Sequence, residues 1–162
     1  MTLPSSYWIK KLQLIKHPEG GYYRETYKSS IMTDKLEKRS IGTSIYYLLH
    51  FDDFSAFHKI DSDEIWHFYY GSSLTLFIID STDGQLSSIV LGNNIEKKEN
   101  LEVIINKNFW FAAQVNEKYS YSLIGCTAIP GFEFKYFELG KRDKLIDLYP
   151  QNQEIIEQFT RT

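Results

Sequence analysis

The feature that most constrains this chain is a succession of short β-prone segments separated by turn residues, which begins at Ile41 and continues to Leu139. The segments recur at the roughly 8 to 12 residue spacing that is typical of sandwiches and barrels built from β-strands. Aromatic residues make up 16% of the chain, a composition that suits pleated surfaces and aromatic-lined pockets. The sequence therefore predicts an all-β fold with a cavity.

The pattern predicts one early strand at Tyr22–Tyr27, a polar loop at Ser29–Arg39, and then the main series of strands. These are expected near Ile41–Phe51, Ser55–Ile60, Ile65–Tyr70, Leu74–Asp80, Leu86–Leu91, Leu101–Ile105, Phe109–Val115, Tyr119–Ile129 and Phe132–Leu139. Asp83-Gly84 indicates the clearest hairpin, because such a pair readily supplies the positive φ angles of a tight turn. Apolar residues at helical spacing predict short helices at Tyr7–Leu14 and Gln151–Thr160.

Length and charge narrow the classes of function. A chain of 162 residues corresponds to one domain. The 18 Lys and Arg against 21 Asp and Glu give a net charge of −3 without a basic block, which argues against a nucleic-acid partner. A single cysteine, Cys126, cannot form an intramolecular disulfide, and no apolar run reaches the roughly 18 to 20 residues of a membrane span. We expect a cytoplasmic protein without a membrane partner.

The segment from Phe57 to Gly71 gathers the most chemistry, since it contains His58, Glu64 and His67. Two histidines and one carboxylate form a ligand triad that suits non-haem iron. In a regular strand, however, Glu64 and His67 point to opposite faces, so they share a cavity only if a bulge intervenes. His58 with Glu64 is the safer pair, and His67 could equally be satisfied by a neighbour at the strand end.

Other polar side chains are weaker candidates. Arg24 could face inward and bind a phosphate or carboxylate through paired donors, or could form an ion pair with a nearby glutamate. Thr43, Tyr46 and Tyr69 could offer hydroxyl groups to a ligand, although tyrosines in β-rich chains are more often packing residues. Cys126 is expected to be a buried small apolar residue rather than a nucleophile.

Four runs of residues carry a resemblance to a known family. They are His17-Pro18-Glu19-Gly20-Gly21-Tyr22-Tyr23-Arg24-Glu25-Thr26-Tyr27, Ser62-Asp63-Glu64-Ile65-Trp66-His67-Phe68, Gly125-Cys126-Thr127-Ala128-Ile129-Pro130-Gly131-Phe132 and Phe137-Glu138-Leu139. With them the chain resembles the small single-domain cupins of cupin family five, a domain of unknown function, from about His17 to Tyr149. The spacing from Glu64 to Gly71 also matches the end of the first cupin motif, with His58 at the position of its first histidine.

The resemblance implies an all-β cupin double-stranded β-helix, a jelly-roll barrel of two antiparallel sheets, as a single domain over residues 1–162. It also implies a homodimer and a shape similar to that of the nucleotide-sugar epimerases that convert deoxy-keto-hexoses. The chain departs from metal-binding cupins at two positions, because Ile60 and Phe111 stand where ligand histidines are usual. Gln114 is only a weak replacement. The sequence therefore predicts no tightly bound transition metal unless His67 turns inward.

The leading functional hypothesis is a metal-independent epimerase or isomerase for a small sugar-like or acidic ligand. His58 would be the acid or base, Glu64 would orient or charge it, and Tyr46 or Tyr69 would give the partner proton. The expected ligand-binding residues are Arg24, Thr43, His67, Tyr69 and Phe111. Two alternatives stay open, namely a metal-dependent dioxygenase or isomerase using His58, Glu64 and His67, and a non-enzymatic binding or storage protein. The edge strand Tyr22–Tyr27 is expected to pair with a second subunit in a homodimer.

Overall fold

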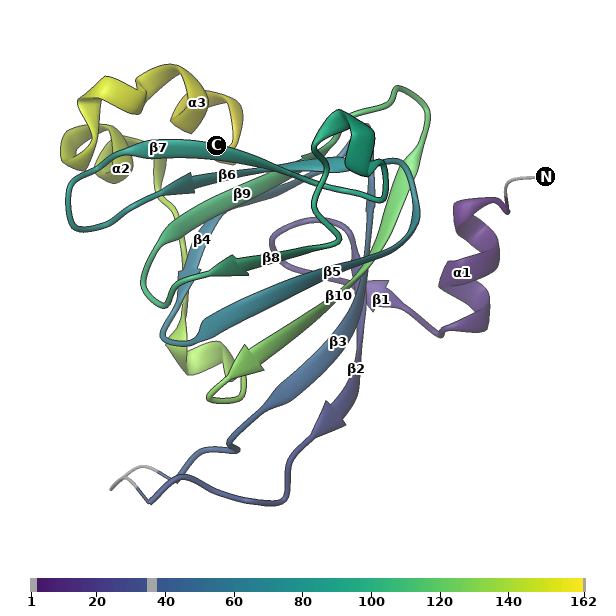
Figure 1. Cartoon of the computed structure of the whole chain (residues 1–162). Coiled ribbons are helices and arrows are strands. Elements are labelled where there is room, and N and C mark those ends of the chain that lie inside the picture. The colour runs from purple at the N-terminus through teal and green to yellow at the C-terminus, as the bar shows by residue number, and fades with distance from the viewer. Residues whose placement is uncertain (1–2, 35–37, 162) are drawn as a thin grey trace.

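Two antiparallel sheets face each other in the computed structural model, which describes residues 3–34 and 38–161 (Figure 1). The six-stranded sheet has the order β1-β2-β3-β10-β5-β8, and the five-stranded sheet has the order β11-β4-β9-β6-β7. Some neighbours, such as β6 and β7, follow each other in sequence, whereas others, such as β3 and β10, come from distant parts of the chain. This arrangement is the expected cupin jelly roll with short helices.

The strands follow the expected segments closely. The six-stranded sheet contains β1 (Ile15–Lys16), β2 (Tyr22–Lys28), β3 (Thr43–His50), β10 (Tyr121–Ile129), β5 (Asp63–Gly71) and β8 (Glu102–Ile105). The five-stranded sheet contains β11 (Phe137–Leu139), β4 (Phe54–Ile60), β9 (Trp110–Val115), β6 (Leu74–Ile79) and β7 (Leu86–Leu91). Gly84 has φ +73°, as the expected turn between β6 and β7 requires.

Short helices lie outside the sheets. They are α1 (Ser5–Lys11), the 3-10 turns η1 (Ile95–Lys97), η2 (Phe134–Tyr136) and η3 (Pro150–Asn152), and the helices α2 (Arg142–Leu148) and α3 (Gln153–Gln158). Two expectations need correction. The strand expected over Phe132–Leu139 begins only at Phe137, because Tyr136 N–H bonds back to the Glu133 carbonyl and closes a 3-10 turn. The sequence analysis also missed α2.

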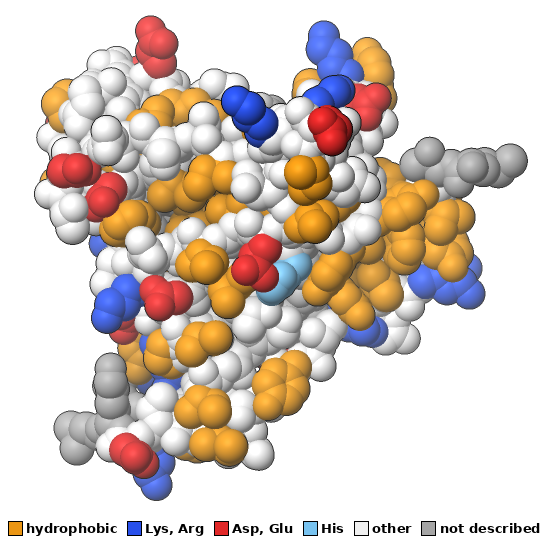
Figure 2. Space-filling model, in the orientation of Figure 1, with side chains coloured by type: hydrophobic (Ala, Val, Ile, Leu, Met, Phe, Trp, Pro, Cys, Tyr) orange, Lys and Arg blue, Asp and Glu red, His pale blue; other side chains and the backbone are white. Residues whose placement is uncertain are grey.

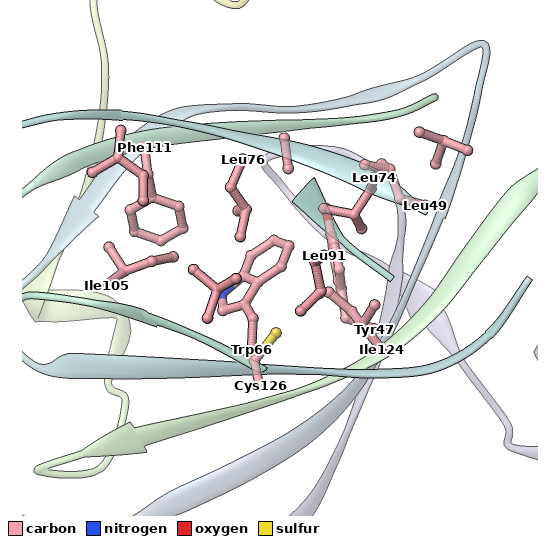
Figure 3. Packing of buried hydrophobic residues seen from close by; sticks show 14 residues of the cluster. Tyr47, Leu49, Trp66, Leu74, Leu76, Leu91, Ile105, Phe111, Ile124 and Cys126 are labelled. Atoms are coloured by element: carbon pink, nitrogen blue, oxygen red, sulfur yellow. The ribbon is translucent and has the colours of Figure 1, made fainter. Parts of the chain in front are cut away.

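The main hydrophobic core fills the space between the sheets. Figure 3 shows its large side chains, among them Trp66, Leu76 and Phe111, pointing toward one another from both layers. A second cluster packs α2 and α3 onto the outer side of the five-stranded sheet through Phe57 and Phe159. A third cluster lies beneath α1 on the outer side of the other sheet. The two sheets are therefore held at a fixed separation, which lets side chains from both line one cavity.

The expected loop at Ser29–Arg39 includes residues 35–37, which lie outside the described part of the chain. Its last residue, Arg39, is buried, and its guanidinium donates hydrogen bonds to the carbonyls of Asp61 and Gly131 and to the Ser62 hydroxyl. The end of this loop is thus fastened to the turn before β5. Among residues 3–34 and 38–161, no helix has the length and apolar character needed to cross a bilayer.

Candidate functional site

A cavity opens between the two sheets. The volume open to water-sized spheres is about 40 Å³, below the roughly 300 to 1,000 Å³ of drug-sized ligand sites, so the cavity suits only a small molecule. Most of its wall is apolar or aromatic, and the polar groups are histidines and carboxyls. The lining residues are His17, Glu19, Tyr23, Thr43, Ile45, His58, Ile60, Glu64, Cys126, Ala128, Phe132 and Phe137.

A tight turn between β1 and β2 brings Glu19 into the cavity. Gly20 and Gly21 have φ angles of +120° and +72°, which side chains rarely allow. A Cβ atom on Gly20 would lie 2.1 Å from the Phe54 carbonyl oxygen, so only glycine fits there. The Tyr47 hydroxyl donates a 2.8 Å hydrogen bond to the Gly20 carbonyl and holds the turn from the core side. Glu19 is 6% exposed as a result.

Glu19 forms a buried pair with His58 of β4. The His58 Nδ1 lies 2.8 Å from the Ala56 carbonyl oxygen, which can only accept, so this contact assigns the ring proton to Nδ1. The opposite ring atom, His58 Nε2, lies 3.1 Å from Glu19 Oε2. Burial lowers the pKa of His58 to about 3, and burial together with the Glu64 carboxyl raises the pKa of Glu19 well above its ordinary value. The pair is therefore a neutral imidazole that accepts a hydrogen bond from a protonated carboxyl group.

His17 flanks the same carboxyl group. Its Nδ1 accepts a 3.3 Å hydrogen bond from the Glu19 backbone N–H and lies 3.6 Å from Glu19 Oε1. Burial lowers the pKa of His17 to about 4, so the ring is neutral near pH 7 and its proton resides on Nε2. The ring packs edge-on against Tyr23 at a centroid distance of 4.6 Å. Glu19 is thus placed between two neutral imidazoles.

Glu64 supplies a second carboxyl group from β5. It borders the open cavity, so it keeps some exposure although protein surrounds it. Burial raises the pKa of Glu64 to about 7, against the opposing influence of the nearby Trp66 indole and Cys126 thiol. The Trp66 N–H is buried and has no acceptor at hydrogen-bond geometry among the described residues. A carboxyl group with a pKa near neutrality can both take and give a proton at pH 7.

The sequence model of one family, described as the Cupin superfamily (DUF985), matches residues 6–140. The chain belongs to this cupin family. All of the cavity-lining residues fall within the matched region.

Two solved structures resemble this cupin over nearly its whole length. The X-ray structure of a protein from Shewanella oneidensis is 34% identical, with a TM-score of 0.91, and the match covers 99% of each chain. A hypothetical protein from Leishmania major is 32% identical, with a TM-score of 0.92 and coverage of 99% and 100%. An uncharacterised protein of Saccharomyces cerevisiae is 31% identical over 144 residues, which are 78% of this chain and 70% of the yeast protein.

Oxalate decarboxylase from Bacillus subtilis matches 89% of this cupin and 36% of its own chain, with a TM-score of 0.58 and 15% identity. At that identity the likeness extends to the fold alone. The chemistry of this cupin must therefore be argued from its own side chains.

Of the site residues expected from the sequence, Thr43, His58 and Glu64 line the cavity. The Thr43 hydroxyl accepts a 2.8 Å hydrogen bond from the Phe132 N–H and so supports the wall. Phe111 lies directly against His58, with ring centroids 4.1 Å apart, but is not part of the lining. These residues come from three different strands, β3, β4 and β5, and from the neighbouring β9.

Arg24, Tyr46 and Tyr69 lie on the outer face of the six-stranded sheet. The expected inward orientation of Arg24 needs correction, because Tyr23 lines the cavity and alternation along β2 turns Arg24 outward. Its guanidinium lies 5.7 Å from the centre of the Tyr46 ring, and the Tyr46 and Tyr69 rings are 6.1 Å apart. Neither tyrosine reaches the cavity from there. The lining residues include no Lys or Arg within the described chain.

His67 also lies on the outer face, as the parity of β5 requires. Its Nδ1 is 3.2 Å from Glu102 Oε2 on the neighbouring strand β8. The set His58, Glu64 and His67 therefore does not converge, and both ring nitrogens of His58 already face partners. In residues 3–34 and 38–161, no group of three or more His, Cys, Asp or Glu side chains is arranged to hold a metal ion. These residues do not fit the ligand set of a metal-binding cupin.

Glu19 and His17 are the histidine and carboxyl side chains of the cavity lining that the sequence did not lead us to propose. Both stand in the run His17-Pro18-Glu19-Gly20-Gly21, which contributed only to the family resemblance. The available signal was a glutamate directly before two glycines, since such a turn can present a side chain away from the strand that follows. Cys126 lines the cavity too, but burial raises the pKa of its thiol well above the ordinary value, which makes it a poor nucleophile.

Proposed function

We propose that this cupin binds a small, uncharged, sugar-like carbonyl compound in the cavity and isomerises or epimerises it by proton transfer without a metal. The observation that carries the proposal is the convergence of Glu64 and the Glu19–His58 pair on one cavity. Proton abstraction beside a carbonyl needs a base with a pKa near the working pH and a second group that protonates the carbonyl oxygen. The cavity offers candidates for both.

The roles differ from those expected from the sequence. The Glu64 side chain lines the cavity and has a pKa of about 7, so its carboxylate is a better base than His58. The carbon–hydrogen bond next to the ligand carbonyl breaks, and its proton moves to Glu64. The electron pair moves onto the carbonyl oxygen, which takes a proton from Glu19. In isomerisation, Glu64 returns its proton to the former carbonyl carbon while the neighbouring hydroxyl passes its proton to the Glu19 carboxylate, which restores both groups. In epimerisation, solvent supplies the proton to the opposite face, the enol proton returns to Glu19, and Glu64 releases its proton to solvent.

His58 acts behind Glu19 in this scheme. The hydrogen bond to the Ala56 carbonyl keeps the ring proton on Nδ1, which leaves Nε2 free to accept from Glu19. Once Glu19 has given up its proton, its carboxylate and the unprotonated His58 Nε2 can both only accept, so the contact favours the return of a proton to Glu19. The apolar walls, which include Phe132 and Phe137, keep water away from the reacting atoms.

The absence of Lys and Arg from the described lining favours an uncharged ligand over an acidic one. An anion would lie beside the Glu64 carboxylate, and like charges in a low-dielectric cavity repel strongly. The neutral alternative gains hydrogen bonds from the carboxyl groups and packing against the aromatic walls. The preference for an uncharged ligand can be tested directly by comparing neutral sugars with their phosphates.

The decisive experiment follows proton exchange by NMR in D2O with unphosphorylated aldoses and ketoses, dihydroxyacetone, and matching sugar phosphates. The wild-type protein should introduce deuterium at the carbon beside the carbonyl of an uncharged compound. Glu64→Gln and Glu19→Gln should reduce this rate by roughly 100-fold or more. His67→Ala is the matched control on the outer face and should exchange at the wild-type rate.

Two outcomes contradict the proposal. Ligand binding without exchange would support the alternative of a binding protein, in which the carboxyl groups only orient the ligand. Exchange confined to the sugar phosphates would reject the uncharged ligand class. With a responsive ligand, the rate should rise as the pH increases toward about 7, because the Glu64 carboxyl must lose its proton before it can act as the base.

A further inference from the structure

The segment that follows the family match lies against the turn that carries Glu19. The match ends at residue 140, and the remaining described residues form α2, η3, α3 and the stretch to Arg161. Figure 1 shows these C-terminal helices as a layer on the five-stranded sheet, away from α1. Arg161 Nη2 donates a 3.0 Å hydrogen bond to the Glu19 carbonyl oxygen. Arg161, which lies outside the family match, thus contacts the backbone of the proposed catalytic residue Glu19.

Arg161 also binds the strand that carries His58. Its Nη2 lies 2.9 Å from the Phe54 carbonyl oxygen and 2.8 Å from Asp53 Oδ1. The guanidinium carbon lies 4.4 Å from the centre of the Phe54 ring. Because β4 begins at Phe54 and contains His58, the guanidinium joins the backbones on which both members of the buried pair are mounted.

Asp53 extends this connection to the glycine turn. Its Oδ2 accepts a 2.9 Å hydrogen bond from the Gly21 N–H, and its Oδ1 accepts one of the same length from the Phe54 N–H. Burial alone would raise the pKa of Asp53, but the hydrogen bonds from Gly21, Arg161 and Phe54 outweigh it and keep this pKa below its ordinary value. The carboxylate is therefore ionised and bridges Arg161 to the residue two positions after Glu19.

The neighbours of Arg161 keep it in place. Phe159 packs on Phe54 and Phe57, and its carbonyl oxygen accepts a 2.8 Å hydrogen bond from the Phe57 N–H. Arg142 of α2 donates to the Thr160 carbonyl oxygen at 2.8 Å. The Arg161 side chain is 40% exposed, but packing and hydrogen bonds of the two residues before it set the position of its guanidinium.

We propose that Arg161 is a positioning residue of the cavity, which acts through the Glu19 carbonyl and Asp53 to hold the Glu19 carboxyl group against His58. The proposal rests on the proposed function for its catalytic meaning only, since the contact itself can be tested without a substrate. A displacement of one ångström in a proton-transfer group can cost large factors in rate. The C-terminal segment would then be a working part of the site.

The test is a pH titration of the Glu19 carboxyl carbon and the His58 ring nitrogens by NMR, in the full chain and without ligand. Glu19 is faced by His17, His58, Glu64 and Tyr47 as well as by Arg161, so the variants must change Arg161 or its bridge alone. In Arg161→Ala the Glu19 titration should move upward by about 0.5 pH units or more, because a nearby positive charge is lost and the turn is released. Arg161→Ala should also shift the His58 ring signals. Asp53→Asn, which removes the bridge and keeps Arg161, should shift these ring signals in the same direction.

Two further variants separate positioning from simple stabilisation. Arg161→Lys keeps the charge without the planar fork, and should restore only part of the wild-type His58 signals. Arg142→Ala loosens the same C-terminal segment without touching the Glu19 turn, so it should lower the unfolding midpoint but leave both titrations unchanged. The proposal is overturned if Arg161→Ala and Asp53→Asn leave both titrations as in the wild type, or if Arg142→Ala reproduces their shifts. Failure of the proposed function would instead appear as absent deuterium exchange in a protein whose titrations respond as expected.

Discussion

Two histidine–glutamate contacts of nearly equal length lie in opposite surroundings. His58 Nε2 is 3.1 Å from Glu19, and these side chains are 3% and 8% exposed. His67 Nδ1 is 3.2 Å from Glu102, and these are 32% and 53% exposed. The first pair faces the cavity between the sheets, and the second lies on the outer face of the six-stranded sheet. Figure 2 shows that outer face, where hydrophobic and polar side chains are interspersed.

The comparison teaches that distance alone does not tell what a pair can do. Water screens the exposed contact, so its energy is small whatever its length. The buried contact lacks that screening, and the cost of burying charge leaves it with one shared proton and no net ionisation. Only the buried pair can therefore respond strongly to a ligand or to a change of its neighbours. The predictions below test that difference.

The largest effect is expected from truncating each histidine in turn. His58→Ala should lower the free energy of unfolding by about 2 to 4 kcal/mol, because it opens a hole beside Phe111 and leaves a buried carboxyl group without its acceptor. His67→Ala should lower it by about 0.5 kcal/mol or less. Urea unfolding of both variants measures the difference. Equal losses in the two variants would mean that burial does not distinguish the pairs.

A smaller effect is expected in the pH dependence of stability. The pKa of Glu64 is about 7 in the folded chain and ordinarily 4.5. The stabilisation that its protonated form adds to the free energy of unfolding is therefore complete below pH 4.5 and is lost as the pH rises toward 7. The pKa of His58 is lowered from 6.5 to about 3, so its contribution is complete above pH 6.5 and is lost as the pH falls toward 3.

Unfolding free energies measured from pH 3 to pH 8 should therefore separate the two groups. Glu64→Gln should reduce the decline on the neutral side, where the remainder comes from Glu19, whose pKa is also raised, and should leave the acid side unchanged. Glu102→Gln on the outer face is the matched control and should leave the neutral-side decline as in the wild type. A Glu64→Gln profile that retains the wild-type decline above pH 4.5 would contradict the assignment.

The next prediction concerns metal content. We expect the protein purified without chelator to carry no stoichiometric transition metal, because His58 and Glu64 face the cavity while His67 does not. Elemental analysis of the wild type, His58→Ala and His67→Ala measures it. A metal present at one equivalent in the wild type and lost in both variants would require the two faces to supply one site, and a metal-dependent reaction would then replace the proposed one.

The smallest effect on the two histidine–glutamate pairs is expected from dimerisation of the chain. We expect a homodimer that pairs the edge strand β2, whose residues beyond Tyr23 have no partner strand on the β1 side. Light scattering should then give twice the chain mass of 19.1 kDa. His67 on β5 lies at the other side of the sheet order, so its surroundings should stay unchanged. A chain mass of 19.1 kDa at micromolar concentration would reject the dimer.

Much of the fold could be predicted because the signals of a strand, alternating apolar residues and flanking turn residues, lie within a few positions of one another in sequence. Alternation and turn residues located β7 at Leu86–Leu91 without error, and placed β4 and β10 within two residues. The segment after Gly131 was harder, because its apolar residues pack on one another across a turn and not along a strand. Phe132 and Phe134, for example, meet at a centroid distance of 5.0 Å. Apolar content alone does not separate those two arrangements.

The site was only partly predictable, for a related reason. Parity along a regular strand correctly separated Glu64 from His67, since it depends on neighbours in sequence. The partner of His58 could not be found in that way, because Glu19 lies on a glycine turn before a different strand of the other sheet. The inward placement of Arg24 was wrong because alternation along a strand does not say which of two adjacent residues, Tyr23 or Arg24, faces the core. Contacts between distant segments require the three-dimensional structure.

The hydrogen bond between Arg161 and the Glu19 carbonyl joins residues 142 positions apart. During synthesis, Glu19 leaves the ribosome early, but its hydrogen bond to Arg161 can form only after almost all of the described chain has been synthesised. Contacts of such long sequence separation form late, since the entropy of closing the loop must be overcome first. On the proposal that Arg161 positions Glu19, a nascent chain that has already formed both sheets would still lack a finished site.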